Sequence, residues 1–188
     1  MKVICLADTQ ASSDILKQYF LSCRFYLDQA DMIVHLGDGY EEARPYLKAY
    51  KNVTCLKGNH DSKNLGLPTE SRQNIYGLRI LFIHGESQNR LKEQLNIWEN
   101  KLRWFLGRPP NLTDYYAELY RRYKNKYDIV VYGHIHIPRI ERIGKTYFFC
   151  PGGFPPKRLL FGHKPSFGMI KLIGTKKSVL PRFYTFNV

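Results

Sequence analysis

The sequence predicts an α/β fold in which two β-sheets pack face to face and helices cover their outer faces. In the first 60 residues, short apolar runs alternate with helix-like segments, a pattern typical of parallel βαβ units. The last third contains strand-like segments separated by Gly/Pro turns, which favours antiparallel pairing. The chain has 188 residues, 44% of them hydrophobic, and is therefore long enough for one packed domain.

We expect three buried strands in the first half, over residues 2–7, 32–36 and 53–56. A helix that starts at Ser12 or Ser13 should follow the first strand. Its apolar residues recur at helical spacing: Ile15, Leu16, Tyr19, Phe20 and Cys23. A shorter helix is expected over residues 41–49. Helices that connect successive strands favour parallel pairing of those strands.

The middle of the chain predicts a hairpin, residues 73–76 paired with 78–83 across Gly77, followed by two helices. The first helix has one apolar stripe, made of Leu91, Leu95, Trp98, Leu102 and Phe105, and ends at residues 107–110. The second helix has an apolar and aromatic side made of Tyr115, Tyr116, Leu119, Tyr120 and Tyr123.

These helices form an insert at about residues 86–127, with nine basic and five acidic residues and a net charge of +4. A helical layer that covers the sheet explains the apolar stripe. A cap that borders the site and a surface for a partner or second subunit are the alternatives.

The last third predicts strands over residues 128–132, 139–143, 146–150, 167–173 and 178–186, with hairpin turns at Gly144 and Gly174. The sequence contains no internal repeat and no linker between domains. We therefore expect a single domain over residues 1–188.

The positive charge is confined to one part of the chain. Residues 1–60 contain seven basic and seven acidic residues, whereas residues 61–188 contain 22 basic and nine acidic residues. The net charge of +13 favours phosphate-bearing partners, nucleic acid included. A general solubility bias is the alternative explanation.

Cysteine usage and the start of the chain indicate a cytoplasmic protein. The four cysteines stand singly, as buried hydrophobic residues in a reducing compartment do. The five-residue apolar run before Asp8 is too short for a signal peptide. No apolar run approaches the roughly 20 residues that span a bilayer, so we expect no membrane partner.

Five polar clusters each follow an apolar run, at residues 8–10, 37–39, 58–61, 84–85 and 133–136. In α/β sheets, ligands bind outside the carboxyl ends of the strands, so these clusters are expected to meet in one crevice. Taken singly, Asp8 could be a helix N-terminal residue and His84 a strand-end histidine bonded to the backbone. His134 and His136 are expected to project to the same side of an extended segment.

The clusters combine carboxylates, amides and imidazoles, a mixed set that suits Mn, Fe or Zn better than Ca or Mg. Beside His60, the clusters offer two Asp, one Asn, one Gln and three His as candidate ligands. These seven ligands exceed what one ion usually takes from a protein. Two ions roughly 3.5–4 Å apart that share a carboxylate would use all of them. Such a pair activates a bridging hydroxide for in-line attack at phosphorus.

The order of these motifs resembles the calcineurin-like metallophosphoesterases, and most of all their small bacterial and archaeal phosphodiesterases. The resemblance covers residues 2–172 and rests on the Asp8 cluster, Gly37-Asp38, Gly58-Asn59-His60-Asp61, His84-Gly85, Gly133-His134-Ile135-His136 and Pro151-Gly152-Gly153. It implies a four-layer αββα sandwich of two mixed sheets flanked by helices, with a dinuclear metal site at the strand ends.

The resemblance also implies a role for each site residue. One ion is expected on Asp8, Gln10, Asp38 and His136, and the second on Asp38, Asn59, His84 and His134. Mn2+ is the first choice, with Zn2+, Fe2+ and Ni2+ as alternatives. His60 is expected to assist the leaving group. Asp61 is interpreted as a supporting group and His35 as a core histidine, while His163 has no assigned role.

The sequence departs from the family pattern at Gln10, where the family usually has His, and at Gly153, where it usually has Ser. Because an amide oxygen is a weaker and harder ligand than imidazole, Gln10 predicts looser binding at its site or a preference for Mn2+.

We therefore expect a metal-dependent phosphoesterase, more specifically a phosphodiesterase. One alternative is a protein-binding scaffold like the retromer subunit of this fold, and another is a nuclease on DNA or RNA. The expected partner is a phosphate-ester substrate, with nucleotides and nucleic acids as candidates. A homodimer is one candidate for the oligomeric state.

Overall fold

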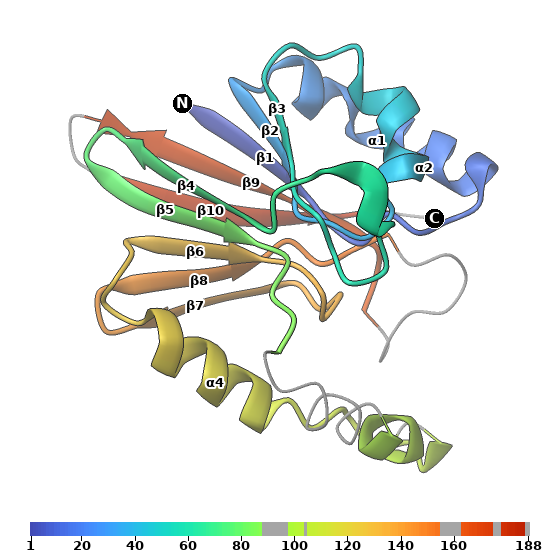
Figure 1. The fold of residues 1–188 in the computed structure, drawn as a ribbon, viewed down its shortest axis with the longest axis vertical. Coiled ribbons are helices and arrows are strands. Elements are labelled where there is room, and N and C mark those ends of the chain that lie inside the picture. The colour runs from blue at the N-terminus through green and yellow to red at the C-terminus, as the bar shows by residue number, and fades with distance from the viewer. Residues whose placement is uncertain (88–97, 104, 155–162, 175–177, 187–188) are drawn as a thin grey trace.

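A computed structural model of the chain describes residues 1–87, 98–103, 105–154, 163–174 and 178–186. Two mixed five-stranded sheets pack face to face, and helices lie on the outer face of each (Figure 1). This arrangement confirms the predicted αββα sandwich.

The first sheet has the strand order β10-β9-β1-β2-β3. β1 pairs in parallel with β2, and β2 with β3, while β9 is antiparallel to both β1 and β10. The strands are β1 (Lys2–Leu6), β2 (Met32–His35), β3 (Val53–Cys55), β9 (Ser166–Ile173) and β10 (Ser178–Thr185). The polar clusters after β1, β2 and β3 therefore lie at the same edge of this sheet.

The second sheet has the order β4-β5-β6-β8-β7. Its central strands β5, β6 and β8 are parallel, and antiparallel strands flank them on both sides. The strands are β4 (Glu70–Ile75), β5 (Leu78–Ile83), β6 (Ile129–Tyr132), β7 (Arg139–Ile143) and β8 (Thr146–Cys150). The hairpin predicted around Gly77 is confirmed.

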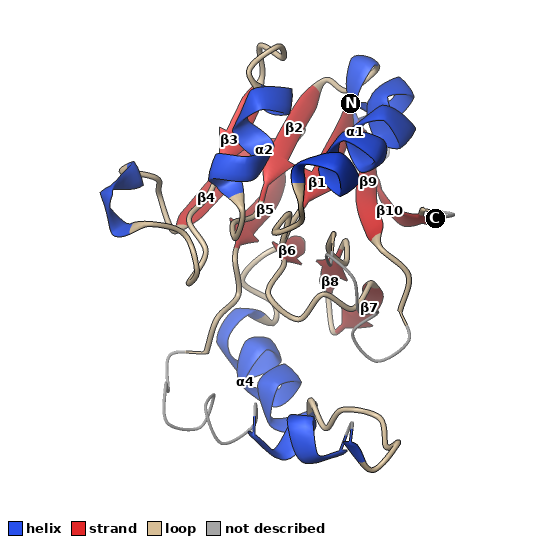
Figure 2. Cartoon of the chain, turned by 90° about the vertical axis from the view of Figure 1, so that its right-hand side faces the viewer, coloured by secondary structure: helices blue, strands red, loops and turns tan. Residues whose placement is uncertain are grey.

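Helices α1 (Ser13–Asp28) and α2 (Tyr40–Leu47) lie in front of β1, β2 and β3 in Figure 2. Helix α4 (Thr113–Tyr123) covers the second sheet, and a short 3-10 helix, η1 (Lys63–Leu65), lies in the loop before β4. No helix in the described part of the chain is long and apolar enough to cross a membrane.

Three layers of apolar side chains hold the sandwich together. Between the sheets, Val34 and Leu36 belong to the same buried cluster as Phe82 and Val131. A second cluster joins α1 and α2 to the outer face of the first sheet. A third joins the tyrosines of α4 to the outer face of the second sheet, where the ring of Tyr120 lies 4.6 Å from that of Phe148. Burial on both faces explains why the inner strands are mostly apolar in sequence.

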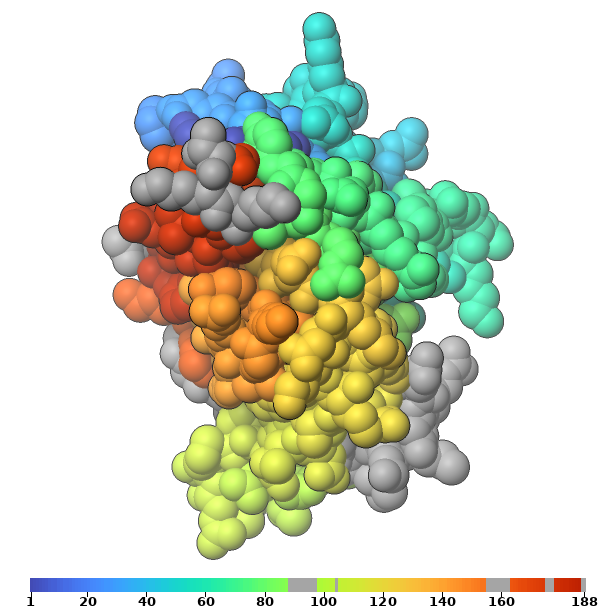
Figure 3. Space-filling model, turned by 90° about the vertical axis from the view of Figure 1, so that its left-hand side faces the viewer, coloured from blue at the N-terminus to red at the C-terminus, as the bar shows by residue number. Residues whose placement is uncertain are grey.

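The first predicted helix of the insert does not cover the sheet in its described part. Leu91 and Leu95 lie outside the described residues, but Trp98, Leu102 and Phe105 are 71%, 60% and 81% exposed. The polar side of residues 98–103 faces the chain instead: Asn100 exchanges two hydrogen bonds with Asn111. Figure 3 shows this part of the chain, in yellow-green, at the lower end of the molecule.

Candidate metal centre

Loops from both sheets bring three buried ligand groups together. Asp8 follows β1, Asp38 follows β2, and His84 follows β5. Their ligand atoms all lie within 4.8 Å of one another, and all three residues are buried. The common edge of the parallel strands and the contact between the sheets therefore create a site with two carboxylates and an imidazole.

Asp8 and His136 form one side of the cluster. The Nε2 atom of His136 lies 3.3 Å from Asp8 Oδ1, and Asp8 Oδ2 accepts a hydrogen bond of 3.1 Å from the backbone N–H of His134. Apart from the 3.3 Å contact with His136 Nε2, Asp8 Oδ1 is buried without a hydrogen bond in the described structure, and His136 Nδ1 is also buried without one. Because a buried polar atom without a partner is costly, this side fits a cation.

His84, Asn59 and His134 form the other side. His84 Nε2 lies 2.9 Å from Asn59 Oδ1 and 3.4 Å from Asp38 Oδ2, and His134 Nδ1 lies 3.2 Å from the same Asn59 oxygen. His84 Nδ1 lies 3.1 Å from the carbonyl oxygen of Leu36, which can only accept a hydrogen bond. A neutral His84 with its N–H on Nδ1 would direct the lone pair of Nε2 into the cluster, whereas the protonated ring donates from both nitrogens.

This backbone hydrogen bond and the place in the cluster are not alternatives for His84, as the sequence had suggested, because one ring nitrogen serves each. Burial alone lowers the pKa of His84, but the hydrogen bond to Asp38 and the charges of Asp8, Asp38 and Glu86 raise it to about 9. For Asp38, burial acts to raise the pKa, and the His84 and His60 contacts lower it overall. The cluster therefore favours a positive charge.

The backbone at the cluster is strained. Asp8, Asp38, His134 and His136 are four of the six non-glycine residues with positive φ in the described part of the chain, at 52°, 58°, 69° and 55°. Such conformations are costly for side chains with a Cβ atom and concentrate at functional sites. Sequence patterns gave no sign of this feature.

The expectation that His134 and His136 project from one extended segment is therefore wrong. The N–H of Ile135 bonds to the carbonyl oxygen of Gly133 at 2.8 Å, which closes a tight turn centred on His134. Ile135 and Ile137 are buried in the apolar layer of the second sheet. As a result, His134 contacts Asn59 and His136 contacts Asp8, on the two sides of the cluster.

Asp61 fixes the loop that carries Asp38. Its carboxylate accepts hydrogen bonds from four backbone N–H groups, those of Asp38, Gly39, Tyr40 and Gly58, at 2.8–3.1 Å. The position of Asp61 agrees with its interpretation as a supporting group.

The chain also approaches Asp38 closely at Gly58. A Cβ atom at this position would lie 2.0 Å from Asp38 Oδ1, so only glycine fits there without displacing the carboxylate.

His35 is buried, as expected for a core histidine, and connects the first two loops. Its Nδ1 accepts a hydrogen bond of 3.3 Å from the N–H of Gly37, and its Nε2 lies 2.9 Å from Thr9 Oγ1. The Thr9 hydroxyl in turn donates to the carbonyl oxygen of Gly39 at 2.8 Å. Burial is the main cause that lowers the pKa of His35 to about 4, so the ring is neutral near pH 7.

Four residues considered in the sequence analysis are less buried than the Asp8, Asp38 and His84 group. Within the described part of the chain, no hydrogen bond ties the half-buried Gln10 side chain to the cluster. His60 and Asn59 are exposed, and the backbone N–H of His60 donates to Asp38 Oδ1 at 2.8 Å. His163 is exposed.

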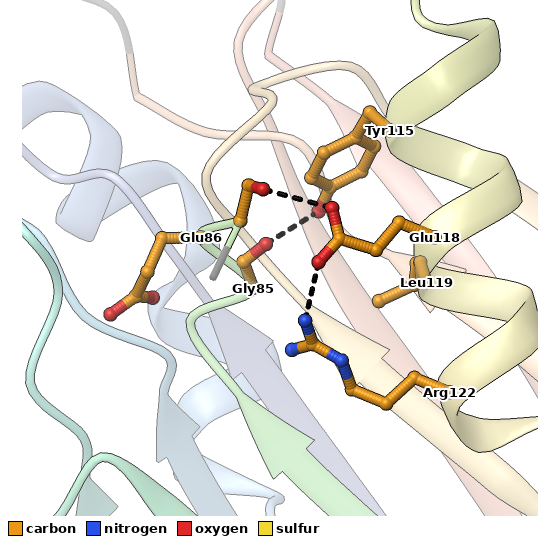
Figure 4. A pocket seen from close by; sticks show the side chains of 7 residues that line it. Gly85, Glu86, Tyr115, Glu118, Leu119 and Arg122 are labelled. Carbon is orange, nitrogen blue, oxygen red and sulfur yellow. Dashed lines mark hydrogen bonds and ion pairs between the residues drawn. The ribbon is translucent and has the colours of Figure 1, made fainter. Parts of the chain in front are cut away.

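Helix α4 contributes a neighbour that the sequence analysis did not assign to the site. Tyr115 lies beside His134, with ring centroids 6.2 Å apart, and bonds to the backbone of Gly85 (Figure 4). The helical periodicity identified Tyr115 as part of a packed face but gave no indication of which loop it would meet.

Comparison with known families identifies the fold. The calcineurin-like phosphoesterase superfamily domain matches residues 1–173. The chain belongs to this superfamily. The resemblance inferred from the motifs is therefore confirmed, and the Asp8, Asp38 and His84 group is a candidate for the divalent metals that the family typically binds. The comparison with curated proteins gave no match.

Solved structures resemble the chain over 98–100% of its length. A mutant of Vps29 from Entamoeba histolytica is 21% identical, covers 100% of both chains and superposes with a TM-score of 0.66. A predicted phosphoesterase from Streptococcus pneumoniae is 19% identical, with 98% and 97% coverage and a TM-score of 0.56. An archaeal phosphodiesterase is 18% identical, with 98% and 100% coverage and a TM-score of 0.60. At these identities the likeness concerns the fold alone.

Proposed function

We propose that this chain is a metal-dependent phosphodiesterase. The observation that carries the proposal is the buried group of Asp8, Asp38 and His84, whose ligand atoms lie within 4.8 Å of one another. Asp8 Oδ1 and His136 Nδ1 are buried and have no hydrogen bond in the described structure, which supports a bound ligand at this site.

In this proposal, Asp8, Gln10, Asp38 and His136 hold one divalent ion, and Asp38, Asn59, His84 and His134 hold the second. Mn2+ is the preferred ion, because Gln10 supplies an oxygen where an imidazole would favour Zn2+. When bound, such a pair neutralises the phosphate ester and lowers the pKa of a water molecule enough to attack phosphorus. The two separate contacts of Asp38, to His84 through Oδ2 and to the N–H of His60 through Oδ1, support its role as the shared carboxylate.

His60 is the residue that we propose for proton transfer to the leaving alkoxide. Its side chain is exposed while its backbone N–H is bonded to Asp38, so the ring stands at the open edge of the cluster. From there it can donate to a substrate oxygen without being a ligand itself.

The test is hydrolysis of bis(4-nitrophenyl) phosphate by chelator-treated protein supplied with Mn2+. His60→Ala should lower kcat about 10²-fold or more and leave Mn2+ binding unchanged, whereas Asp38→Ala should abolish both. Comparison with 4-nitrophenyl phosphate separates diesterase from monoesterase activity. Equal turnover by the wild type and both variants would show that the hydrolysis is not due to this site.

A protein-binding scaffold is the second candidate, because Trp98, Leu102 and Phe105 present apolar surface to solvent. The Vps29 structures have the same fold. Metal analysis of the purified protein separates the two functions. A scaffold should contain far fewer than two ions per chain and show no turnover with added Mn2+.

A nuclease is the third candidate, since the net charge of +13 favours a phosphate backbone as ligand. Binding of a single-stranded oligonucleotide should then weaken steeply as salt is raised. No binding at low salt would remove this candidate.

A further inference from the structure

Helix α4 holds the loop after β5 through two hydrogen bonds from its inner face (Figure 4). The hydroxyl of Tyr115 donates to the carbonyl oxygen of Gly85 at 3.0 Å, and Glu118 accepts a hydrogen bond of 2.9 Å from the Ser87 hydroxyl. Gly85 directly follows His84 in the chain. The insert is therefore bonded to the chain directly after His84, whose buried imidazole belongs to the candidate metal centre.

The ring of Tyr115 also contacts the loop after β6. Its centroid lies 6.2 Å from that of His134, with an interplanar angle of 29°, and 6.4 Å from that of Tyr132. The rings of His84 and His134 are 5.2 Å apart. Tyr115 thus contacts both the loop that carries His84, after β5, and the loop that carries His134, after β6.

The packing at this point leaves little room for adjustment. A Cβ atom at Gly85 would lie 3.0 Å from the Tyr115 hydroxyl oxygen and 3.3 Å from Tyr132 Cβ. Gly85 has a φ of 107°, a conformation that side chains rarely adopt. Burial raises the pKa of Tyr115 well above its usual range, so the hydroxyl keeps its proton as a donor to the Gly85 carbonyl group.

Glu118 is itself held in place. Its other carboxylate oxygen pairs with Arg122 one turn further along α4, at 2.5 Å. Arg122 and Glu118 are both about three-quarters buried, with side-chain exposures of 23% and 25%. The inner face of α4 therefore presents an ordered row of polar groups to residues 85–87.

We propose that Tyr115 is a positioning residue for His84 and His134, and that helix α4 sets the affinity of the second metal ion through it. The identity of the ligand rests on the proposed function, whereas the orientation of the two imidazole rings can be measured without any metal. Groups that hold metal ligands in place typically contribute 10- to 100-fold to affinity.

Two substitutions separate the hydroxyl from the ring. Tyr115→Phe removes only the hydrogen bond to Gly85, and Tyr115→Leu also removes the ring beside His134. Tyr120→Phe is the matched control, since Tyr120 lies on the same helix and its hydroxyl bonds to Glu141 on β7, away from the metal centre. Urea denaturation measures how much each substitution lowers the free energy of unfolding, which is its effect on stability apart from metal binding.

Calorimetric titration of chelator-treated protein with Mn2+ measures the two affinities. Both Tyr115 variants should bind the second ion about tenfold more weakly and the first ion as the wild type does. Tyr120→Phe should match the wild type in both steps. Unchanged affinities in the Tyr115 variants, or an equal loss in Tyr120→Phe, would overturn the proposal.

The metal-free protein provides an independent readout. Imidazole NMR signals of His84 and His134, assigned with His84→Gln and His134→Gln, should shift in Tyr115→Phe and Tyr115→Leu but not in Tyr120→Phe. If the wild type binds no ion, the proposed function fails, and these signals alone decide the positioning role. Ring signals that are identical in the wild type and both Tyr115 variants would overturn it.

Discussion

The carboxylate of Asp61 accepts a hydrogen bond of 2.8 Å from the backbone N–H of Asp38, the residue that we expect both metal ions to share. The same Asp61 oxygen accepts a second hydrogen bond of 2.8 Å from Gly58. One side chain thus connects the loop after β2 to the loop after β3. The position of Asp38 depends on a group that we do not expect to touch an ion.

Asp61→Ala should therefore lower the stability of the protein and weaken its metal binding. The substitution leaves four backbone N–H groups without their charged acceptor. We expect a loss of about 3 kcal/mol or more in the free energy of unfolding, measured by urea denaturation. Asp31→Ala is the control, because Asp31 is exposed and accepts one backbone hydrogen bond, from Lys2. An equal loss in both variants would contradict the role given to Asp61.

Gly58→Ala should displace the Asp38 carboxylate, since the added methyl group would lie 2.0 Å from Oδ1. We expect a loss of about 3 kcal/mol in stability and weaker binding of both ions in a Mn2+ titration. Gly66→Ala is the control: its φ of 63° makes alanine costly by about 1–2 kcal/mol, but no atom lies within 4 Å of the new methyl group. Metal binding by Gly66→Ala should be normal, and normal binding by Gly58→Ala would contradict the close contact.

His35 should make the metal-free protein less stable in mild acid. Its pKa is lowered, chiefly by burial, to about 4, whereas the unfolded chain has an ordinary histidine pKa of about 6.5. Its contribution is complete above pH 6.5 and is lost as the pH falls towards 4, because protons bind to the unfolded state first. The loss between pH 7 and pH 5 is about 2 kcal/mol.

Urea denaturation at pH 7 and pH 5 measures this dependence. His35→Gln keeps polar atoms near Thr9 and Gly37 but does not titrate. Its stability should fall less between these pH values than that of the wild type, by the same 2 kcal/mol or so. Equal pH dependence in the two proteins would mean that His35 titrates normally.

Gln10→His should tighten Zn2+ binding at one of the two sites and leave the other unchanged. Imidazole is a better ligand for Zn2+ than an amide oxygen is. Competition of the variant with a colorimetric Zn2+ chelator measures the effect, and Gln10→Ala shows what the amide itself contributes. If both variants bind Zn2+ as the wild type does, Gln10 is not at an ion site.

Much of the architecture could be predicted because strands that are buried on both faces are mostly apolar in sequence. Apart from His35, the run around Val34 is apolar because both faces of β2 are covered. Three of the polar residues that follow such runs, Asp8, Asp38 and His84, do lie together at the strand ends.

What could not be predicted depends on contacts between distant segments. His134 and His136 alternate with Ile135 and Ile137 as residues of a strand do, yet the segment turns. Periodicity shows which side chains share a face but not what that face meets. For the same reason Trp98 was expected in a covering layer and is exposed, while the contact of Tyr115 with the site was missed.

The candidate ligands come from both halves of the sandwich: Asp8, Asp38 and Asn59 follow strands of one sheet, and His84, His134 and His136 follow strands of the other. Ions bound there would link the two sheets to each other, in addition to the apolar layer that packs between them. Sliding of one sheet over the other would have to break the coordination. Resistance to heat should then rise with the logarithm of the free ion concentration.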